Sequence, residues 1–276
     1  MKKLIVMAMV AMLMASCSEQ NYLEDFVSNP SAPLSEQVSP QSSIVNSYLE
    51  QARWGSGEAY LKLAQCYHDG NGVKRDFVSM LCMAALAQQH GAVGGLDEFV
   101  KSQPASEYKA TFDALTHIWD RKYDKAHALA DSLMGKGCAE GYAVKGILAL
   151  EHRDTTEFRR LSIMAAEMGS TFGELLLCVK DWKNSLDFDI ARLILLSDRI
   201  PVANLMLAAH YADLTNNEKN YDKMASYFYL KADKCGLLGK KNARWLLNYY
   251  KNGGIRTIDD QDYARIKKLA GEEYDR

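Results

Sequence analysis

Apolar residues recur at helical spacing between residues 57 and 91. A first stripe lies at i, i+4, i+5 and i+8, positions that share one face of a helix, and consists of Ala59, Leu63, Ala64 and Tyr67. A second stripe consists of Met80, Met83, Ala84 and Ala87. Between the stripes, the Gly-Asn-Gly-Val run at 70–73 is typical of a turn, and Asp76 of a helix cap. With Gly91 as a helix end, the pattern predicts a helical hairpin.

The pattern returns near the C-terminus and, more weakly, in between. The first stripe is repeated by Ala203, Leu207, Ala208 and Tyr211, and a second helix is expected over Met224–Gly236. A third copy starts at Ala243 and Leu247, with a turn at 252–255 and a helix expected over Asp259–Tyr274. At intervals of 30 to 46 residues, an aromatic residue marks the start of each proposed second helix: Phe77, Tyr123, Phe158, Phe188, Tyr221 and Tyr263. Helical repeats have periods of about 34 to 47 residues, so the spacing favours such a repeat.

This pattern predicts an all-α fold over residues 44–276, a right-handed superhelical solenoid of about six helix-turn-helix repeats. A helix is expected over Ser42–Arg53, before the first repeat. Four of the second helices are expected to end at a glycine: Gly91, Gly137, Gly169 and Gly236. Pro201 stands near the equivalent place after the second helix that starts at Phe188. No run of alternating β-branched residues predicts a strand. An unrelated helical bundle is the alternative architecture.

The segment 57–91 resembles the Sel-one-like repeat, a close relative of the tetratricopeptide repeat. That family has an Ala-x3-Leu-Gly-x2-Tyr first helix, a Gly-x-Gly-Val turn, an Asp cap and a closing Gly. The matching residues are Ala59, Leu63, Tyr67, Gly70, Gly72, Val73, Asp76, Ala87 and Gly91. Ala64 replaces the small glycine, Leu86 replaces the family's lysine, and Gln88 replaces its second alanine.

The resemblance implies that the first helices line a concave groove, which suits extended peptides or protein edges. Proteins of this kind resemble adaptors and scaffolds, an inference that rests on the fold alone. Candidate partner-binding residues are polar or aromatic first-helix positions that packing does not use: Tyr60, Lys62, Asn204, His210, Arg244 and Asn248. The alternative for each of them is a solvated surface residue.

The N-terminus has the pattern of a secretory signal peptide over residues 1–16. Two early lysines precede an apolar run over Leu4–Ala15, shorter than the about 20 residues that span a bilayer. Ala15-Ser16-Cys17 resembles the lipobox of bacterial lipoproteins, which implies that Cys17 is lipidated and becomes the mature N-terminus. Met14 stands where that family usually has leucine, and the alternative is a free cysteine after an ordinary cleavage site.

Residues 17–43 are rich in Ser, Pro, Asn and Gln and are expected to form a flexible tether between the lipid and the folded part. Such an anchor implies an outer-membrane lipoprotein that faces the periplasm or the cell surface. The net charge of -2, from 33 basic and 35 acidic residues, gives no basic stripe for a nucleic acid, so none is expected as a partner.

Candidate chemistry is sparse. The chain has no HExxH or GxSxG motif and no phosphate-binding loop, and its six histidines are scattered over the repeats. His68 lies beside Asp69 and near Cys66, which suggests a nucleophile set, but the repeat register places His68 at the end of a first helix and favours a structural role. We therefore expect a binding protein and not an enzyme, with no metal site and no cofactor.

Besides Cys17, the chain has Cys66, Cys82, Cys138, Cys178 and Cys235. Without CxxC spacing, neither a zinc ribbon nor a thioredoxin-like site is supported. An oxidising compartment permits disulfides, and the odd number leaves at least one thiol unpaired. Cys66 and Cys82 fall on the two helices of one hairpin and could face each other. For most of the five, a role as a small buried apolar residue is favoured.

Three functional hypotheses follow. The first is a lipid-anchored scaffold or adaptor for a protein or peptide in the cell envelope. The second is a glycan- or peptidoglycan-binding protein, because sugars stack on aromatic faces and the chain has four tryptophans: Trp54, Trp119, Trp182 and Trp245. The third is a hydrolase that acts on cell-wall material, for which the sequence displays no motif.

Overall fold

A computed structural model describes residues 43–92, 95–181, 187–214, 219–254 and 259–272. The signal peptide, Cys17 and the tether lie outside the described residues. The helices are α3 Ser43–Arg53, α4 Gly57–Asp69, α5 Phe77–Gln89, α6 Gly95–Ser102, α7 Glu107–Trp119, α8 Tyr123–Gly135, α9 Ala139–Glu151, α10 Thr155–Glu167, α11 Thr171–Leu176, α12 Ile190–Leu196, α13 Pro201–Leu214, α14 Lys219–Lys234, α15 Gly239–Lys251 and α16 Asp260–Ala270. Two short strands, β1 Val179–Asp181 and β2 Asp187–Phe188, separate α11 from α12.

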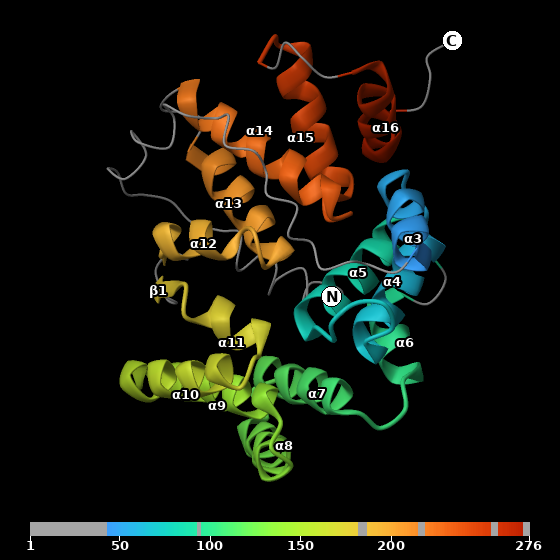
Figure 1. Cartoon of the computed structure of the whole chain (residues 1–276). Coiled ribbons are helices and arrows are strands. Elements are labelled where there is room, and N and C mark those ends of the chain that lie inside the picture. Colours follow the sequence, from blue (N-terminus) through green and yellow to red (C-terminus); the bar gives the residue numbers. More distant parts are fainter. Residues whose placement is uncertain (1–42, 93–94, 182–186, 215–218, 255–258, 273–276) are drawn as a thin grey trace.

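The chain is an all-α solenoid in which successive helices pack on one another, except at α11 and α12, which the two strands separate (Figure 1). The most extensive contacts are between α4 and α5, α7 and α8, α8 and α9, α9 and α10, α13 and α14, and α15 and α16. Most of these pairs coincide with the hairpins that the hydrophobic pattern predicts. In the described part of the chain, no helix is both long enough and apolar enough to cross a membrane.

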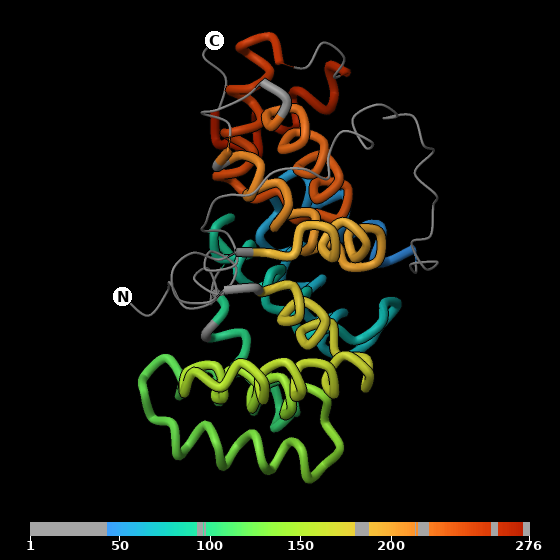
Figure 2. The backbone as a smooth tube through the Cα atoms, turned by 90° about the vertical axis from the view of Figure 1, so that its left-hand side faces the viewer, coloured from blue at the N-terminus to red at the C-terminus, as the bar shows by residue number. Residues whose placement is uncertain are grey.

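Helix α5 departs from a simple solenoid, because it also contacts α11, α13 and α15. The chain runs from α6 to α7–α10 at the lower end of Figure 1 and returns past α5 through α11 and α12. It ends with α13–α16 at the upper end, an order that Figure 2 shows from the side. In a regular solenoid each unit contacts only its neighbours. The superhelix therefore closes around α5, which contacts helices of the middle and C-terminal parts of the chain as well as its own neighbours.

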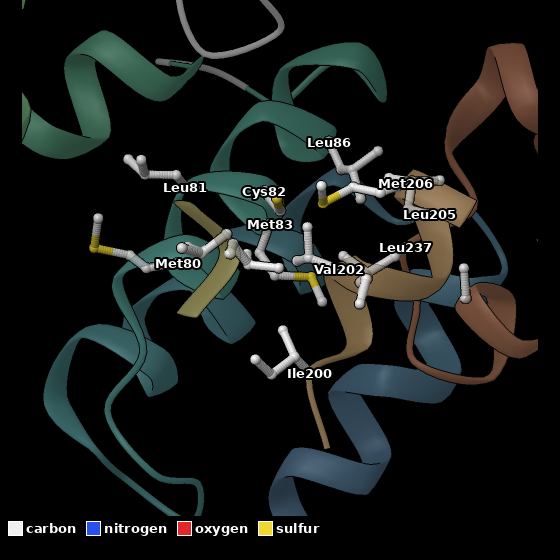
Figure 3. Packing of buried hydrophobic residues seen from close by; sticks show 14 of the residues in the cluster. Met80, Leu81, Cys82, Met83, Leu86, Ile200, Val202, Leu205, Met206 and Leu237 are labelled. Atoms are coloured by element: carbon white, nitrogen blue, oxygen red, sulfur yellow. The ribbon is translucent and has the colours of Figure 1, made fainter. Parts of the chain in front are cut away.

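The composition of α5 explains its central place. Ten of its 13 residues are buried, and a helix that is apolar on all sides belongs in a core. Figure 3 shows Met83 and Leu86 of α5 beside Val202 and Met206 of α13. Leu237, which follows α14, completes this contact between the N-terminal and C-terminal parts of the chain.

A buried ion cluster joins the first described helix to the last ones. On α16, Arg265 donates from its two terminal nitrogens to the two carboxylate oxygens of Asp233 on α14, over 2.6 and 2.5 Å. Both side chains are only 3% exposed. Arg53, at the end of α3, approaches the same carboxylate at 3.3 Å, and Asp262 accepts a further bond from Arg265 at 2.8 Å. The cluster thus ties α3, α14 and α16 together.

Capping side chains and glycines begin or end most helices near the residues that the sequence predicts. Side-chain oxygens accept first-turn N–H groups at the caps Ser56, Asp76, Ser106, Asp154, Ser170, Asp189 and Asp259. The four glycines expected to close second helices all have positive φ. At the C-terminus the prediction was too long: α16 ends at Ala270 because Gly271 adopts a left-handed φ of 75°. Tyr274 lies outside the described residues.

The fourth repeat also differs from the prediction. Phe188 was expected to start a second helix, but it lies in β2, where it pairs with Val179 of β1 in antiparallel fashion. Helix α12 begins two residues later, capped by Asp189. Cys178, Val179 and Phe188 are all buried, so this short β ladder pairs the backbone of a segment that enters the core. The helices on either side, α11 and α12, have only 6 and 7 residues.

The five cysteines in the described part of the chain are free, and all but Cys235 are buried. Cys66 and Cys82, which the sequence left as a candidate pair, are both free thiols. Burial raises the pKa of the Cys82, Cys138 and Cys178 thiols to about 12. Because the thiolate is the reactive form, these thiols are expected to be inert at neutral pH.

Candidate functional site

Three of the six predicted partner-binding residues lie in the packed core. Tyr60 on α4 is fully buried and stacks on His90, with ring centroids 5.3 Å apart. On α13, Asn204 is 1% exposed and donates from Nδ2 to the backbone oxygen of Ser197 over 2.6 Å. His210 is 7% exposed, with its ring edge-on to Tyr211. These positions were predicted to be free of packing, but neighbouring helices cover them in the closed solenoid.

The other three predicted residues are exposed. Lys62 on α4 lies over the ring of Tyr48, 5.3 Å from its centroid, and 3.5 Å from the carboxylate of Glu58. Arg244 and Asn248 lie one turn apart on α15 and are both solvent-exposed. The structure thus brings Arg244 and Asn248 together on one helix, while Lys62 lies on a different one.

Helix α15 presents an exposed face that we call the α15 surface, formed by Lys241, Arg244, Trp245, Asn248 and Tyr249. The rings of Trp245 and Tyr249 are half-buried and stack with centroids 5.5 Å apart and planes 19° apart. Beneath them, the buried ring of Tyr229 on α14 lies 5.1 Å from that of Trp245. The aromatic pair is therefore held in one orientation by packing from below.

Two polar groups of the α15 surface, the Arg244 guanidinium and the Tyr249 hydroxyl, have defined roles or charge states. Arg244 donates from Nε to the backbone oxygen of Ala270 over 2.9 Å, which caps the C-terminal end of α16. Burial, followed by the negative charge of Asp222, raises the pKa of the Tyr249 hydroxyl, which therefore stays protonated at neutral pH. Aromatic rings flanked by a guanidinium and an amide are typical of residues that anchor protein interfaces.

Sequence reasoning found only part of this surface. It selected Arg244 and Asn248 for partner binding, and Trp245 only as one of four tryptophans for glycans. Tyr249 was missed, although its i, i+4 spacing from Trp245 places both rings on one helix face. That spacing was the available signal.

The fold defines the chain as an all-α solenoid protein with an aromatic and basic surface on its penultimate helix. No family model matches the chain, and neither a curated protein nor a solved structure does. The resemblance to Sel-one-like repeats therefore stays a prediction from the residues of 57–91. Among the residues that the structure describes, no group of three or more His, Cys, Asp or Glu side chains is placed to hold a metal ion.

Proposed function

We propose that this protein is a lipid-anchored scaffold of the bacterial outer membrane, which binds a protein or peptide partner through the α15 surface. The observation that carries the binding role is the stacked, half-buried pair of Trp245 and Tyr249 beside the exposed Arg244 and Asn248. Aromatic and arginine residues dominate the binding energy of protein interfaces. The lipobox-like Ala15-Ser16-Cys17 supports the anchor.

A peptidoglycan or other glycan is the second candidate ligand, because the face of Trp245 is also suited to stack on a sugar ring. Sedimentation of the purified protein with isolated sacculi separates the two candidates. A protein scaffold stays in the supernatant, whereas a glycan binder sediments and loses this property in Trp245→Ala.

If Cys17 carries the lipid anchor, replacing it is expected to release the protein from the membrane. The Cys17→Ala variant lacks the thiol that receives the lipid, so we expect it to leave the membrane fraction and appear in the soluble fraction after cell lysis. Immunoblots of the two fractions measure this, with metabolic labelling by a palmitate analogue as a second readout. A Ser18→Ala variant is the matched control and stays in the membrane. Equal membrane retention of Cys17→Ala would refute the lipid anchor.

If the α15 surface binds the partner, substitutions in this surface are expected to reduce the amount of partner that the chain captures. In cells, chemical crosslinking followed by mass spectrometry of the purified chain identifies the envelope proteins bound to it. Trp245→Ala and Asn248→Glu are expected to reduce the captured partner at least about tenfold, because hot-spot truncations cost about 2 kcal/mol or more. Asn248 is exposed, so its variant tests the surface without disturbing the core.

Trp119→Ala is the control, because Trp119 on α7 is 46% exposed and distant in the chain from α15. It is expected to leave partner capture unchanged. A partner that is captured equally by Trp245→Ala, Asn248→Glu and the unmodified chain binds elsewhere, and the proposed surface is then wrong.

A further inference from the structure

The structure places a serine, a histidine and an aspartate in one hydrogen-bonded line where α4 ends and α7 begins. Nε2 of His68 lies 3.1 Å from Oγ of Ser106, and Nδ1 of the same ring lies 2.7 Å from Oδ1 of Asp69. His68 is the penultimate residue of α4, and Ser106 caps α7. The two residues are 38 positions apart in the sequence, so no local pattern predicts that they meet.

The direction of the two hydrogen bonds follows from the charge of Asp69. The hydrogen bond from His68, followed by that from Gln65, lowers the pKa of the Asp69 carboxyl, so it is ionised at neutral pH and only accepts. Nδ1 of His68 is therefore the donor in its bond to Asp69. In the tautomer with a single proton, on Nδ1, the lone pair of Nε2 faces Ser106 and the serine hydroxyl donates to it. This is the arrangement in which a histidine acts as a general base towards a serine.

Further contacts hold Ser106, His68 and Asp69 in this arrangement. Gln65 donates from Nε2 to the second oxygen of Asp69 over 2.8 Å and exchanges hydrogen bonds with Gln103 over 3.2 and 3.0 Å. Arg75 donates from Nε to the backbone oxygen of His68 over 3.0 Å. The guanidinium of Arg75 lies 4.8 Å from the centre of the Tyr108 ring on α7. The base, its orienting carboxylate and the serine are therefore fixed to one another by neighbouring groups.

Helix capping alone does not account for this line. Ser56 caps α4 by accepting the N–H of Ala59 over 3.2 Å, and Ser170 caps α11 in the same way over 3.1 Å. Ser106 makes the corresponding bond with the N–H of Lys109, also over 3.2 Å. Of these three capping serines, Ser106 lies next to an imidazole whose other nitrogen is held by a carboxylate.

Because Ser106 stands at the start of α7, the first N–H groups of that helix lie next to it and can stabilise a negative charge. Helix α7 has 13 residues, and the N–H groups of its first turn, including that of Glu107, have no acceptor within the helix. In hydrolases with a serine at a helix start, the N–H of the following residue helps to stabilise the oxyanion. Ser106 is half-buried and so retains contact with solvent, while His68 is 93% shielded, with its side chain 7% exposed.

We propose that Ser106, His68 and Asp69 form a nucleophilic site that transfers an acyl group from a carboxylic ester to water. Oγ of Ser106 attacks the ester carbonyl while its proton passes to Nε2 of His68, and the oxyanion forms next to the first N–H groups of α7. The C–O bond to the alcohol breaks, and His68 returns the proton to the leaving alcohol. Water then attacks the acyl-serine while His68 takes its proton, the acyl C–Oγ bond breaks, His68 returns the proton to Oγ of Ser106, and the acid is released. Asp69 and Gln65 are positioning residues.

The test uses the purified chain and a biotin-linked alkyl fluorophosphonate. In this reaction an O–P bond to Ser106 forms, the P–F bond breaks, fluoride leaves and the proton goes to His68. We expect labelling of the peptide that contains Ser106, located by mass spectrometry, and hydrolysis of p-nitrophenyl butyrate by the same preparation. His68→Gln is expected to lower both rates about 10² to 10⁴-fold, the usual effect of losing a general base.

Control variants distinguish a nucleophilic role of Ser106 from its role as the N-cap of α7. Ser106→Asp removes the nucleophile but keeps a side chain that caps helices as well as serine does, so it is expected to fold normally and to lose labelling and hydrolysis. Ser56→Ala removes a cap of the same geometry and is expected to label at Ser106 like the unmodified chain. Asp69→Asn is expected to lower kcat more than it changes KM and to alter the pH profile. If Ser106 labels no faster than Ser56 or Ser170, or if Ser106→Asp hydrolyses the ester equally well, the proposal is wrong.

Discussion

Replacing Arg265 with methionine is expected to lower the free energy of unfolding by about 3–5 kcal/mol, the cost of breaking a buried ion pair by removing one partner. Arg265 neutralises Asp233 through two hydrogen bonds, and both side chains are 3% exposed. Without the guanidinium, the Asp233 carboxylate retains only the longer contact with Arg53, 3.3 Å away. The loss is large because a charge that cannot reach water is left without its main partner.

Urea unfolding followed by circular dichroism measures this loss. Lys251→Ala is the control, because Lys251 forms an ion pair with Glu272 at the surface and such pairs contribute about 0–1 kcal/mol. The double variant Asp233→Leu/Arg265→Met is expected to recover most of the stability, since it removes both charges from the interior. If Arg265→Met unfolds like Lys251→Ala, the buried pair does not hold α3, α14 and α16 together.

The local part of this fold could be predicted from the sequence, because its signals act over a few residues. Apolar spacing gave the hairpins, and Asp76 and Gly91 marked a helix start and a helix end where the structure has them. Aromatic residues marked second helices even where the repeat is degenerate, as at Tyr123, the first residue of α8. An all-α solenoid followed from these signals, and the structure confirms it.

The long-range part could not be predicted, because it depends on which faces meet across the chain. The apolar character of α5 is visible in the sequence, but its contacts with α11, α13 and α15 are not. For the same reason Tyr60 and Asn204 were assigned to a surface and lie in the core. The pairing of His68 with Ser106 joins two capping regions whose residues each have an ordinary local explanation.

The closure around α5 predicts a second large effect. Phe77→Ala is expected to lower the free energy of unfolding by about 3–5 kcal/mol, the usual cost of emptying a buried phenylalanine site. Phe77 is 2% exposed, and its ring lies 5.4 Å from that of Tyr108 on α7 and 5.8 Å from that of Phe172 on α11. Phe77→Leu, which keeps much of the volume, is expected to lose less, and Trp119→Ala at the surface about 0.5 kcal/mol or less.

Native-state hydrogen exchange then decides whether the solenoid is closed. If each unit depended only on its neighbours, the loss of Phe77 would weaken protection in α4, α5 and α6 and fade along the chain. Because Phe77 contacts Phe172, 95 residues away in sequence, we expect the amides of α11 to lose protection together with those of α5. The amides of α8, which lies between them in sequence but packs on α7 and α9, are expected to lose less. Loss of protection that spreads evenly from α5 through α8 to α11 would instead show an open stack of repeats.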